Sequence, residues 1–381
     1  MSVDRPLRIA MMLESDGPGG AEVMVLRLSD ELRRRGHFIL PVGPAGRTGW
    51  LADQFRRHGF APEVYHLRGP IDPGGVRDLL RLLRRHKIDV VHSHEFTMGV
   101  YGAAAARILG LPQVLTMHGG LTVCKALRRR VALRWAMRNS SRTVMVSNAT
   151  RDQFSRDLGL EELDLTVIPN GVPLQLGDAS RVREEFRVEP NECVILAVGN
   201  LERHKGHRVL LEALALLRSR EPGALWKLII AGGRGGAQHQ DLLNFVSSSQ
   251  LGDRVKIVLN RHDIPDLLAL ANVFVMPSLW EGLPLALLEA MVSRKAVIAS
   301  STAGIPEAIT NGEDGILVEP GNAPALSDAL RLMVLDAERR RYFADAAFFR
   351  AQRDFSAQVM AERYERVYFE SLLVDSSARV A

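Results

Sequence analysis

The stretch VFVMPSLWEGLPLALLEAM, residues 273–291, contains one complete structural unit of this chain. It opens with a short β-branched apolar run (273–278) and continues through a polar turn that holds Glu281 and Gly282. Apolar residues at helical spacing follow Pro284. Short apolar runs bounded by Gly, Pro or polar residues are typical of strands that are buried on both faces. The stretch therefore predicts a buried strand that leads directly into a helix.

Strand–helix units of this kind fill the chain on both sides of that stretch. Helical segments such as AEVMVLRLSDELRRRG, residues 21–36, separate the strands, and Gly36 ends this one. Repeated units with short connections predict a parallel, doubly wound α/β sheet in each half. Strands are predicted at 7–13, 38–42, 63–67, 89–94, 113–118, 143–147 and 165–169, and again at 193–200, 227–232, 255–259, 273–278, 296–300 and 315–319.

The pattern breaks once, over residues 171–190, where Gly, Pro and charged residues occur without a convincing strand. Such a segment is typical of an inter-domain linker. We therefore predict two Rossmann-like domains, residues 1–173 and 190–352, followed by a helical segment over 353–381. Ligands of such sheets bind beyond the carboxyl ends of the strands, so the site is expected in a cleft that the two domains face.

The composition places the chain among soluble globular proteins. Hydrophobic residues make up 46% and charged residues 24% of its 381 residues, and Lys and Arg exceed Asp and Glu by 49 to 44. No apolar run reaches the roughly 18 residues that a membrane-spanning helix needs. The two cysteines, Cys124 and Cys193, exclude a disulfide framework and a four-cysteine zinc site. Because the N-terminus lacks a secretory signal, a cytoplasmic location is expected.

The turn and helix in the opening stretch predict an anion site. Pro284 is expected at the first helical position, where its fixed φ and missing N–H do no harm. The backbone N–H groups of Leu283, Leu285 and Ala286 are then expected to face the cleft together with the positive end of the helix dipole. A diphosphate fits such a site.

Two carboxylates flank this predicted anion site. Glu281 precedes the helix and Glu289 lies inside it, so they are expected to accept hydrogen bonds from separate hydroxyl groups of one ligand. The alternative is a charge at the helix start and an ordinary surface residue. Because apolar residues flank Glu289 on both sides, its charge calls for a specific reason.

A second signal is VGNLERHKGH, residues 198–207, again a predicted strand that runs into a helix. Lys205 places a cation where that strand meets the cleft, and Arg203 is a candidate to assist it. A fixed cation neutralises the charge that grows on a departing nucleoside diphosphate. The alternative is that both side chains are simply exposed.

Further candidates lie in the first half of the chain. His118 stands at the end of a predicted strand, directly before glycines, where a structural and a catalytic role are both open. Gly19 and Gly20 open the first helix and allow a ligand to approach the backbone closely. His92 and His94 share one face of a strand and suggest a metal site, but no third ligand is apparent.

Together these motifs are specific, and the chain resembles the retaining glycosyltransferases of family 4, which have the GT-B architecture. The resemblance implies transfer of a sugar from a nucleoside-diphosphate sugar, with UDP or GDP expected, to an acceptor hydroxyl in bacterial surface polysaccharide or glycolipid synthesis. The motifs that carry it cover nearly the whole chain: GGAE at 19–22, DVVHSH at 89–94, LTMHG at 115–119, VIPNGV at 167–172, VGNLERHKG at 198–206 and EGLPLALLE at 281–289.

The resemblance also implies roles for the matching residues. Glu281 is implied to contact hydroxyls of the donor sugar, and Glu289 the ribose. Lys205 is implied to bind the diphosphate, and His118 to lie beside the transferred sugar, so that His118, Lys205 and Glu281 form the expected catalytic set. The final helix is implied to cross back to the first domain. The other expected substrate contacts are Gly19, Gly20, Asn200, Arg203, Gly282, Leu283, Pro284 and Leu285.

One position departs from the family pattern. Many members have Val-Gly-Arg-Leu where this chain has VGNL, so Asn200 replaces an arginine that shares the diphosphate. Arg203, three residues on, is the candidate to supply that cation. No cofactor and no metal are expected, and the Asp-x-Asp pair that holds Mg²⁺ or Mn²⁺ in another transferase architecture does not occur.

Two other classes of protein share this architecture or its ligand. One is a different GT-B enzyme, such as a sugar phosphorylase or a nucleotide-sugar 2-epimerase. A phosphorylase needs pyridoxal phosphate on a lysine or a dedicated phosphate site, and the six lysines offer no clear candidate. The other is a non-catalytic sugar-nucleotide sensor, which is disfavoured because the carboxylates, the lysine and the histidine occur together.

The expected partners are a nucleotide-sugar donor and a saccharide or lipid-linked acceptor. Nucleic acid is not expected, because no recognition motif accompanies the basic charge. The stretch KALRRRVALRWAMR, residues 125–138, is a candidate for peripheral contact with an anionic membrane at its inner face. Its charges do not collect on one helical face, which favours surface electrostatics over deep insertion. An ordinary exposed helix is the alternative.

Overall fold

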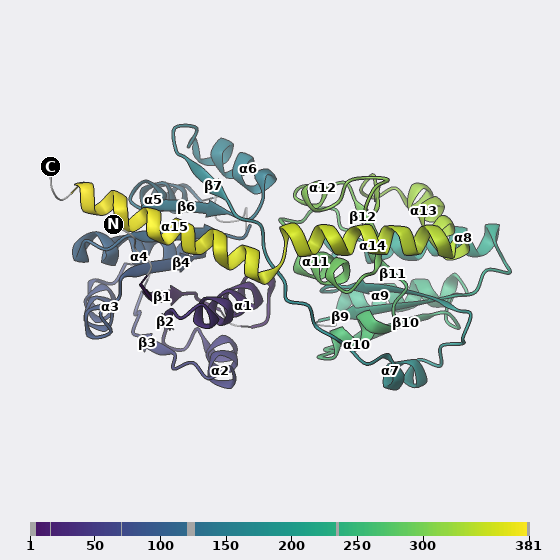
Figure 1. Cartoon of the computed structure of the whole chain (residues 1–381). Coiled ribbons are helices and arrows are strands. Elements are labelled where there is room, and N and C mark those ends of the chain that lie inside the picture. Colours follow the sequence, from purple (N-terminus) through teal and green to yellow (C-terminus); the bar gives the residue numbers. More distant parts are fainter. Residues whose placement is uncertain (1–4, 16, 70, 120–125, 234–235, 379–381) are drawn as a thin grey trace. The chain divides into compact units, whose positions relative to one another are not determined.

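The chain folds into two compact units (Figure 1). The first unit combines Met1–Gly171 with Ala357–Ala381, and the second unit is Val172–Ser356. Each is built on one parallel sheet with helices on its faces, which confirms the predicted fold class. The structure, a computed structural model, describes residues 5–15, 17–69, 71–119, 126–233 and 236–378.

The sheet of the first unit has seven parallel strands in the order β3-β2-β1-β4-β5-β6-β7. The central strands are buried on both faces, as their unalternated apolar runs predicted. Because β1 pairs with both β2 and β4, the strand order reverses between β1 and β4. The strands are β1 (Arg8–Met12), β2 (Phe38–Pro44), β3 (Glu63–Tyr65), β4 (Val90–His94), β5 (Gln113–Met117), β6 (Arg142–Met145) and β7 (Leu165–Val167).

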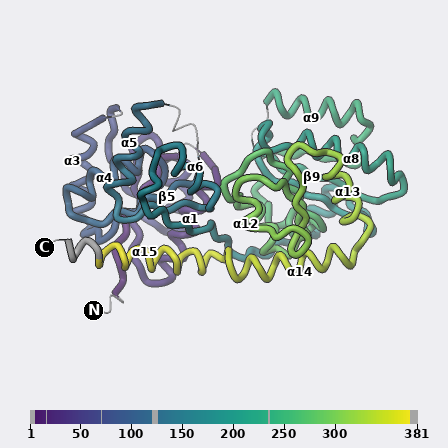
Figure 2. The backbone as a smooth tube through the Cα atoms, turned by 90° about the horizontal axis from the view of Figure 1, so that it is seen from above, coloured from purple at the N-terminus to yellow at the C-terminus, as the bar shows by residue number. Residues whose placement is uncertain are grey.

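Helices cover both faces of this sheet. On one face α4 packs between α3 and α5, and on the other α1 packs against α15. Figure 2 shows α15, the yellow helix of the first unit, running past α1. The helices of the unit are α1 (Gly20–Arg34), α2 (Gly49–Arg57), α3 (Pro73–Arg85), α4 (Glu95–Leu109), α5 (Leu127–Arg138), α6 (Asn148–Leu158) and α15 (Ala357–Ala378).

The C-terminal helix α15 is bound to the first unit by both apolar and polar contacts. Its Tyr364 and Tyr368 side chains are fully buried, and Val367 is 6% exposed. The Tyr364 hydroxyl lies 3.1 Å from Thr116 Oγ1 of β5, and the Tyr368 hydroxyl lies 2.7 Å from His92 Nδ1 of β4. The helix α15 therefore packs on one face of the sheet and contributes hydrogen-bond partners to Thr116 and His92 on that face.

The sheet of the second unit has six parallel strands in the order β10-β9-β8-β11-β12-β13. One continuous core lies between this sheet and the helices α8, α9 and α13. The strands are β8 (Cys193–Val198), β9 (Trp226–Gly232), β10 (Val255–Leu259), β11 (Val273–Met276), β12 (Ala296–Ser300) and β13 (Ile316–Val318). The helices are α7 (Ala179–Glu185), α8 (His207–Arg220), α9 (Ala237–Ser248), α10 (Ile264–Leu270), α11 (Leu285–Val292), α12 (Ile305–Ala308), α13 (Ala323–Leu335) and α14 (Ala337–Asp354).

The segment expected to be a linker belongs to the second unit, which begins at Val172 rather than at residue 190. Its short helix α7 packs on α10, and Arg181 forms ion pairs with Asp263 and Asp266 there. A Cβ atom on Gly177 would lie 2.0 Å from a backbone oxygen of α10, so glycine permits this close approach. The segment also buries Val182 and Phe186, which are four residues apart, but α7 is only seven residues long, so its apolar pattern in the sequence is short.

Candidate active site

In the second unit, the loops after β8 and β11 meet at the carboxyl ends of these neighbouring strands. The first loop passes through a 3₁₀ turn, η2 (Arg203–Lys205), and the Leu279 N–H of the second loop donates to the His204 carbonyl at 2.7 Å. Gly206 has a φ of +69°, and a Cβ atom there would lie 1.9 Å from the Pro277 carbonyl oxygen. Only glycine therefore allows the two loops to pack this closely.

The close packing brings Lys205 and Glu281 together. Lys205 Nζ donates to Glu281 Oε1 at 2.5 Å, and Ser278 Oγ donates to the same oxygen at 3.0 Å. The side chain of Glu281 is only 11% exposed and that of Lys205 is 22% exposed. A carboxylate this deeply placed needs a counter-charge, which Lys205 supplies. The two charges that the sequence assigned to one ligand are thus direct partners, a contact that the sequence did not predict.

The helix α11 begins one residue later than expected, because Pro284 is its N-cap rather than its first helical residue. Leu288 N–H donates to the Pro284 carbonyl at 3.4 Å, and among the described residues no side chain caps this end. The N–H groups without a partner inside the helix are those of residues 285–287, and Leu283 lies before the helix. The positive end of the helix dipole therefore lies slightly further along the chain than predicted.

Glu289 lies in the second turn of α11, on its half-exposed side. Ala286, three residues earlier, is half-buried like Glu289, whereas Leu287 and Leu288 are fully buried. Residues three apart on a helix lie on one face. The apolar neighbours in the sequence therefore face the core, and the carboxylate faces the open side. Gly282 is buried in the turn that precedes the helix.

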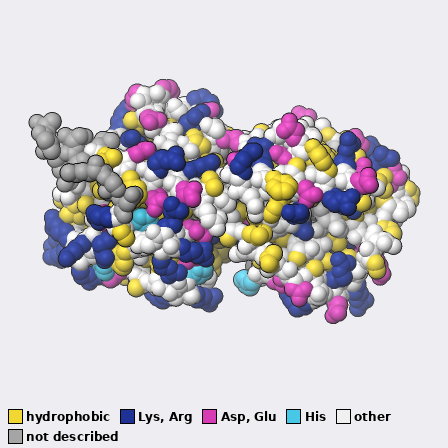
Figure 3. Space-filling model, viewed as in Figure 1, with side chains coloured by type: hydrophobic (Ala, Val, Ile, Leu, Met, Phe, Trp, Pro, Cys, Tyr) yellow, Lys and Arg dark blue, Asp and Glu magenta, His cyan; other side chains and the backbone are white. Residues whose placement is uncertain are grey.

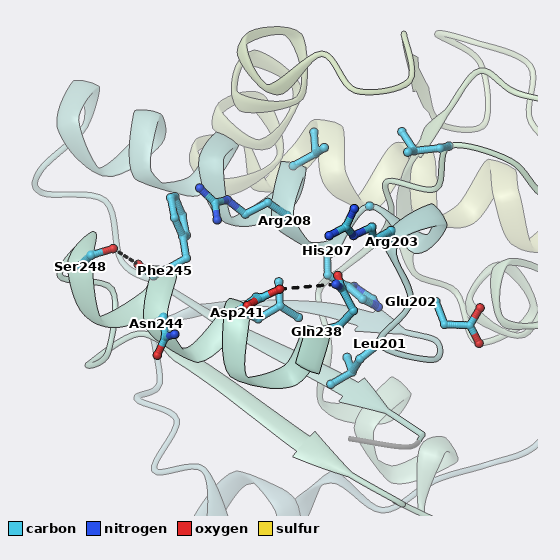
Figure 4. Close-up of a pocket in the computed structure, with 14 residues that line it drawn as sticks. Leu201, Glu202, Arg203, His207, Arg208, Gln238, Asp241, Asn244, Phe245 and Ser248 are labelled. Atoms are coloured by element: carbon cyan, nitrogen blue, oxygen red, sulfur yellow. Dashed lines mark hydrogen bonds between the residues drawn. The ribbon is translucent and has the colours of Figure 1, made fainter. Parts of the chain in front are cut away.

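Asn200 and Arg203 are both exposed in the loop after β8. The Asn200 side chain approaches Gly233 at the end of β9, where a Cβ atom would lie 2.2 Å from Asn200 Oδ1. Arg203 lines a groove of about 690 Å³ between α8 and α9, in which Arg208 stacks on Phe245 (Figure 4). Within the described ranges no acidic side chain pairs with Arg203. Its guanidinium is therefore open to an anionic ligand.

In the first unit, His118 follows β5 and is held at its backbone and at its ring. Its N–H donates to Glu95 Oε1 at 3.0 Å, and its Nε2 lies 3.0 Å from His94 Nδ1. Burial lowers the pKa of His118 to about 4, so the imidazole is neutral at physiological pH. The structure thus gives His118 a fixed position and no positive charge.

Glu95 is a residue that the sequence analysis did not identify. It begins α4 at a φ of +63°, a strained value for a non-glycine residue, and such strain occurs often at functional sites. Burial, with the charge of Glu22 as a further cause, raises the pKa of Glu95 to about 7. The only signal was an acidic residue directly after the strand motif DVVHSH.

The glycines at the start of α1 lie beside Glu22, the carboxylate whose charge helps to raise the pKa of Glu95. Gly19 is the N-cap and Gly20 the first residue of α1. Ser15 Oγ donates to Glu22 Oε1 at 2.8 Å, and a Cβ atom on Gly19 would lie 2.4 Å from Glu22 Oε2. Glycine at this position therefore makes room for the Glu22 carboxylate as well as for the backbone turn.

Comparison with known families covers both units. The model for Glycosyltransferase Family 4 matches residues 18–176, and the model for glycosyl transferases group 1 matches residues 178–348. A D-inositol 3-phosphate glycosyltransferase of Paenarthrobacter aurescens is 30% identical over 69% of this chain and 68% of its own length. The chain belongs to glycosyltransferase family 4. The resemblance of the motifs is thereby confirmed.

Two further comparisons agree with this membership. The UDP-Gal:alpha-D-GlcNAc-diphosphoundecaprenol alpha-1,3-galactosyltransferase of Escherichia coli is 29% identical over 74% of this chain and 76% of its own. The structure of HepE from Anabaena, solved with UDP and glucose, has a TM-score of 0.80 at 23% identity, over 96% of this chain and 100% of that chain. This family-4 chain is thus a glycosyltransferase with the GT-B fold.

Proposed function

We propose that this family-4 enzyme is a retaining, metal-independent hexosyltransferase that moves a sugar from a UDP- or GDP-sugar to an acceptor hydroxyl. The observation that carries the proposal is the cluster of Lys205, Glu281 and Ser278 beside the N-terminus of α11. It combines a fixed cation, a carboxylate and unpaired helix N–H groups. These groups suit a diphosphate that carries a sugar.

In the proposed reaction, the bond between the anomeric carbon and the diphosphate breaks, the acceptor oxygen forms the new bond on the same face of the sugar, and the proton of the acceptor hydroxyl passes to the departing diphosphate. Lys205, assisted by Arg203, neutralises the charge that grows on the departing nucleoside diphosphate. The N–H groups of residues 285–287 stabilise the same charge through the helix dipole. The enzyme itself thus provides the positive field that the leaving group needs.

The two glutamates are proposed to position the donor. Ionised carboxylates only accept hydrogen bonds, so Glu281 is suited to hydroxyls of the sugar and Glu289 to hydroxyls of the ribose. Because Lys205 contacts Glu281 directly, the cation that meets the diphosphate also holds the carboxylate that meets the sugar. In the first unit, Gly19 and Gly20 are proposed to lie beside the phosphates or the acceptor, and His118 beside the transferred sugar.

The relatives support a choice of donor and acceptor to test first. The name of the Escherichia coli relative specifies UDP-Gal and an undecaprenol-linked acceptor, and HepE was solved with UDP and glucose. We therefore place UDP-hexoses first among the donors. We propose a saccharide or a lipid-linked saccharide as the acceptor, in the synthesis of a bacterial surface polysaccharide or glycolipid.

A donor screen tests the proposed function. The protein is mixed with UDP-, GDP- and ADP-sugars, binding is followed by thermal shift, and release of the nucleoside diphosphate is measured with candidate acceptors. We expect stabilisation by one nucleotide class and acceptor-dependent release. Release of sugar 1-phosphate that requires inorganic phosphate would indicate a phosphorylase, and interconversion of two nucleotide sugars an epimerase. Binding without turnover for any acceptor would favour a sensor.

We further propose peripheral contact with an anionic membrane through the first unit. Leu127, Val131 and Trp135 form an exposed stripe along α5, with 73%, 60% and 40% of each residue exposed. An apolar groove of about 520 Å³ lies between α3 and α4, and its lining residue Ile71 is 92% exposed. Lys and Arg side chains gather over α3 (Figure 3), where Arg77, Arg81, Arg84 and Arg85 are exposed.

Each basic residue near an anionic surface contributes about 1 kcal/mol of attraction. Two arginines of α5 already have partners within the protein: Arg138 pairs with Glu162, and Arg130 donates to the Asp157 backbone carbonyl. Lys125, at the start of the predicted membrane segment, lies outside the described residues. Of the described helices, none is both long and apolar enough to cross a bilayer. Liposome sedimentation tests the contact, which should require anionic lipid and weaken with salt. Equal recovery in the supernatant with neutral and anionic vesicles would refute it.

A further inference from the structure

The two histidines that suggested a metal site are engaged at all four ring nitrogens. His92 Nδ1 lies 2.7 Å from the Tyr368 hydroxyl, and its Nε2 lies 2.9 Å from Thr116 Oγ1. His94 Nδ1 lies 3.0 Å from His118 Nε2, and its Nε2 lies 3.0 Å from Met11 Sδ. Both side chains are fully buried. The pair therefore has the contacts of a hydrogen-bonded support rather than of a metal site.

The low pKa values of these histidines determine how many protons each ring carries. Burial lowers the pKa of His92 to about 3 and that of His118 to about 4, and it lowers the pKa of His94 well below its ordinary range. Each ring is therefore neutral near pH 7 and carries one proton. A neutral imidazole has one N–H donor and one lone-pair acceptor, and which nitrogen is which follows from the partners.

The contact of His94 with Met11 determines where its proton lies. A thioether sulfur has lone pairs and no hydrogen, so only an N–H can make a favourable contact with it. His94 Nε2 therefore holds the proton, and His94 Nδ1 presents its lone pair. Because that lone pair faces His118 Nε2 at 3.0 Å, His118 must donate from Nε2. The remaining ring nitrogen, His118 Nδ1, then has a lone pair.

We propose that Met11, acting through His94, fixes the tautomer of His118 so that Nδ1 accepts a hydrogen bond from a substrate hydroxyl. The partner's identity as a substrate hydroxyl rests on the proposed function; the tautomer does not. Met11 and His94 are positioning residues in this scheme. His118 Nδ1 is buried, and no group within the described ranges makes a hydrogen bond to it. The lone pair of His118 Nδ1 is therefore suited to accept a hydrogen bond from a ligand hydroxyl group.

The consequence is a restriction on what His118 can recognise. Phosphate and carbonyl oxygens also present lone pairs, so they would be repelled by Nδ1, whereas a sugar hydroxyl can donate to it. The ring cannot turn easily to present its other side. It stacks on His94 with ring centroids 5.3 Å apart, and its backbone N–H is held by Glu95. His118 is thus assigned to a hydroxyl of the saccharide and not to the diphosphate.

Nuclear magnetic resonance of the full chain with ¹⁵N-labelled histidine tests the tautomer directly, without any assay of activity. Protonated and lone-pair ring nitrogens differ widely in ¹⁵N shift, so each ring shows which nitrogen carries the proton. For His118 in the wild-type protein we expect a protonated Nε2 and a lone pair at Nδ1. A protonated Nδ1 would overturn the proposal, whether or not the enzyme transfers a sugar.

Met11→Leu tests the cause, since leucine keeps the volume and removes the sulfur acceptor. Met12→Leu is the matched control, because Met12 is equally buried but packs in the cluster on the opposite face of the sheet. We expect mixed tautomers at His94 and His118 and an about fivefold lower kcat/KM in Met11→Leu only, as for loss of one neutral hydrogen bond. An unchanged His118 spectrum in folded Met11→Leu would refute the role of Met11. A normal tautomer response with no transferase activity would refute the proposed function alone.

Discussion

Substitution of Gly206 by alanine tests the loop packing that brings Lys205 and Glu281 together. The new Cβ would lie 1.9 Å from the Pro277 carbonyl oxygen, closer than two such atoms can approach, and the residue would have to keep a φ of +69°. A left-handed conformation costs a non-glycine residue about 1–2 kcal/mol. Overpacking of a tight site costs about 1–3 kcal/mol more. We therefore expect a loss of about 3 kcal/mol in the free energy of unfolding of the second unit.

Gly312→Ala, in the same unit, separates the cost of the left-handed backbone from the cost of the close contact with Pro277. Gly312 has a φ of +80°, but a Cβ atom there would meet nothing within 4 Å, so only the backbone term applies. Urea denaturation followed by tryptophan fluorescence should show a loss of about 1–2 kcal/mol for this control. Calorimetric titration with UDP and GDP should show weaker binding in Gly206→Ala and unchanged binding in Gly312→Ala. If the two variants lose equal stability and bind nucleotide equally, the close contact with Pro277 does not support the site.

Four further predictions concern named side chains of the two units. Lys205→Ala should lower kcat by about 100-fold, because the ammonium meets charge that grows in the transition state. It should also destabilise the second unit, because it leaves the largely buried Glu281 without its counter-charge. Lys256→Ala, which removes an exposed lysine, is the control, and a kcat within a factor of two of wild type in the folded Lys205→Ala protein would contradict the role. Glu289→Ala should weaken nucleotide-sugar binding by about 1.5–3 kcal/mol in calorimetry, and an unchanged dissociation constant would remove Glu289 from the site. The free energy of unfolding should rise with pH between about 4 and 6.5, because the lowered pKa values of His92, His94 and His118 mean that the unfolded chain binds more protons there. Glu95→Gln should make this rise steeper, since the raised pKa of Glu95, about 7 against an ordinary 4.5, opposes it; a slope that is unchanged or shallower in the variant would show that Glu95 is not perturbed.

The strands and the site loops were predictable because both depend on local sequence. Buried parallel strands appear as short apolar runs, and polar residues at their carboxyl ends must share one edge of the sheet. These two rules are enough to place Lys205 and Glu281 on loops at the same edge. Their direct contact was not predictable, because it depends on how closely the loops approach, and that distance is set by the single missing Cβ of Gly206.

Other contacts could not be predicted from the sequence, because the two residues of each contact are far apart along the chain. Met11 contacts His94 across 83 positions, and Tyr368 contacts His92 across 276. No periodicity links such pairs, since each member looks like an ordinary core residue in its own segment. Glu95 was missed for a different reason. Its importance lies in a positive φ and in a hydrogen bond to the backbone of His118, neither of which has a sequence signature.

The return of α15 to the first unit has a consequence for the order in which the protein can mature on the ribosome. The second unit is continuous, Val172–Ser356, so all of its strands are synthesised before α15 appears. The first unit must wait for its last element, and until then His92 and Thr116 lack the tyrosine hydroxyls that contact them in the finished fold. Nascent chains stalled before residue 357 should therefore protect the C-terminal sheet from protease sooner than the N-terminal one, although the latter is made first. A fusion that hinders docking of the last helix would damage the half of the protein that was translated earliest.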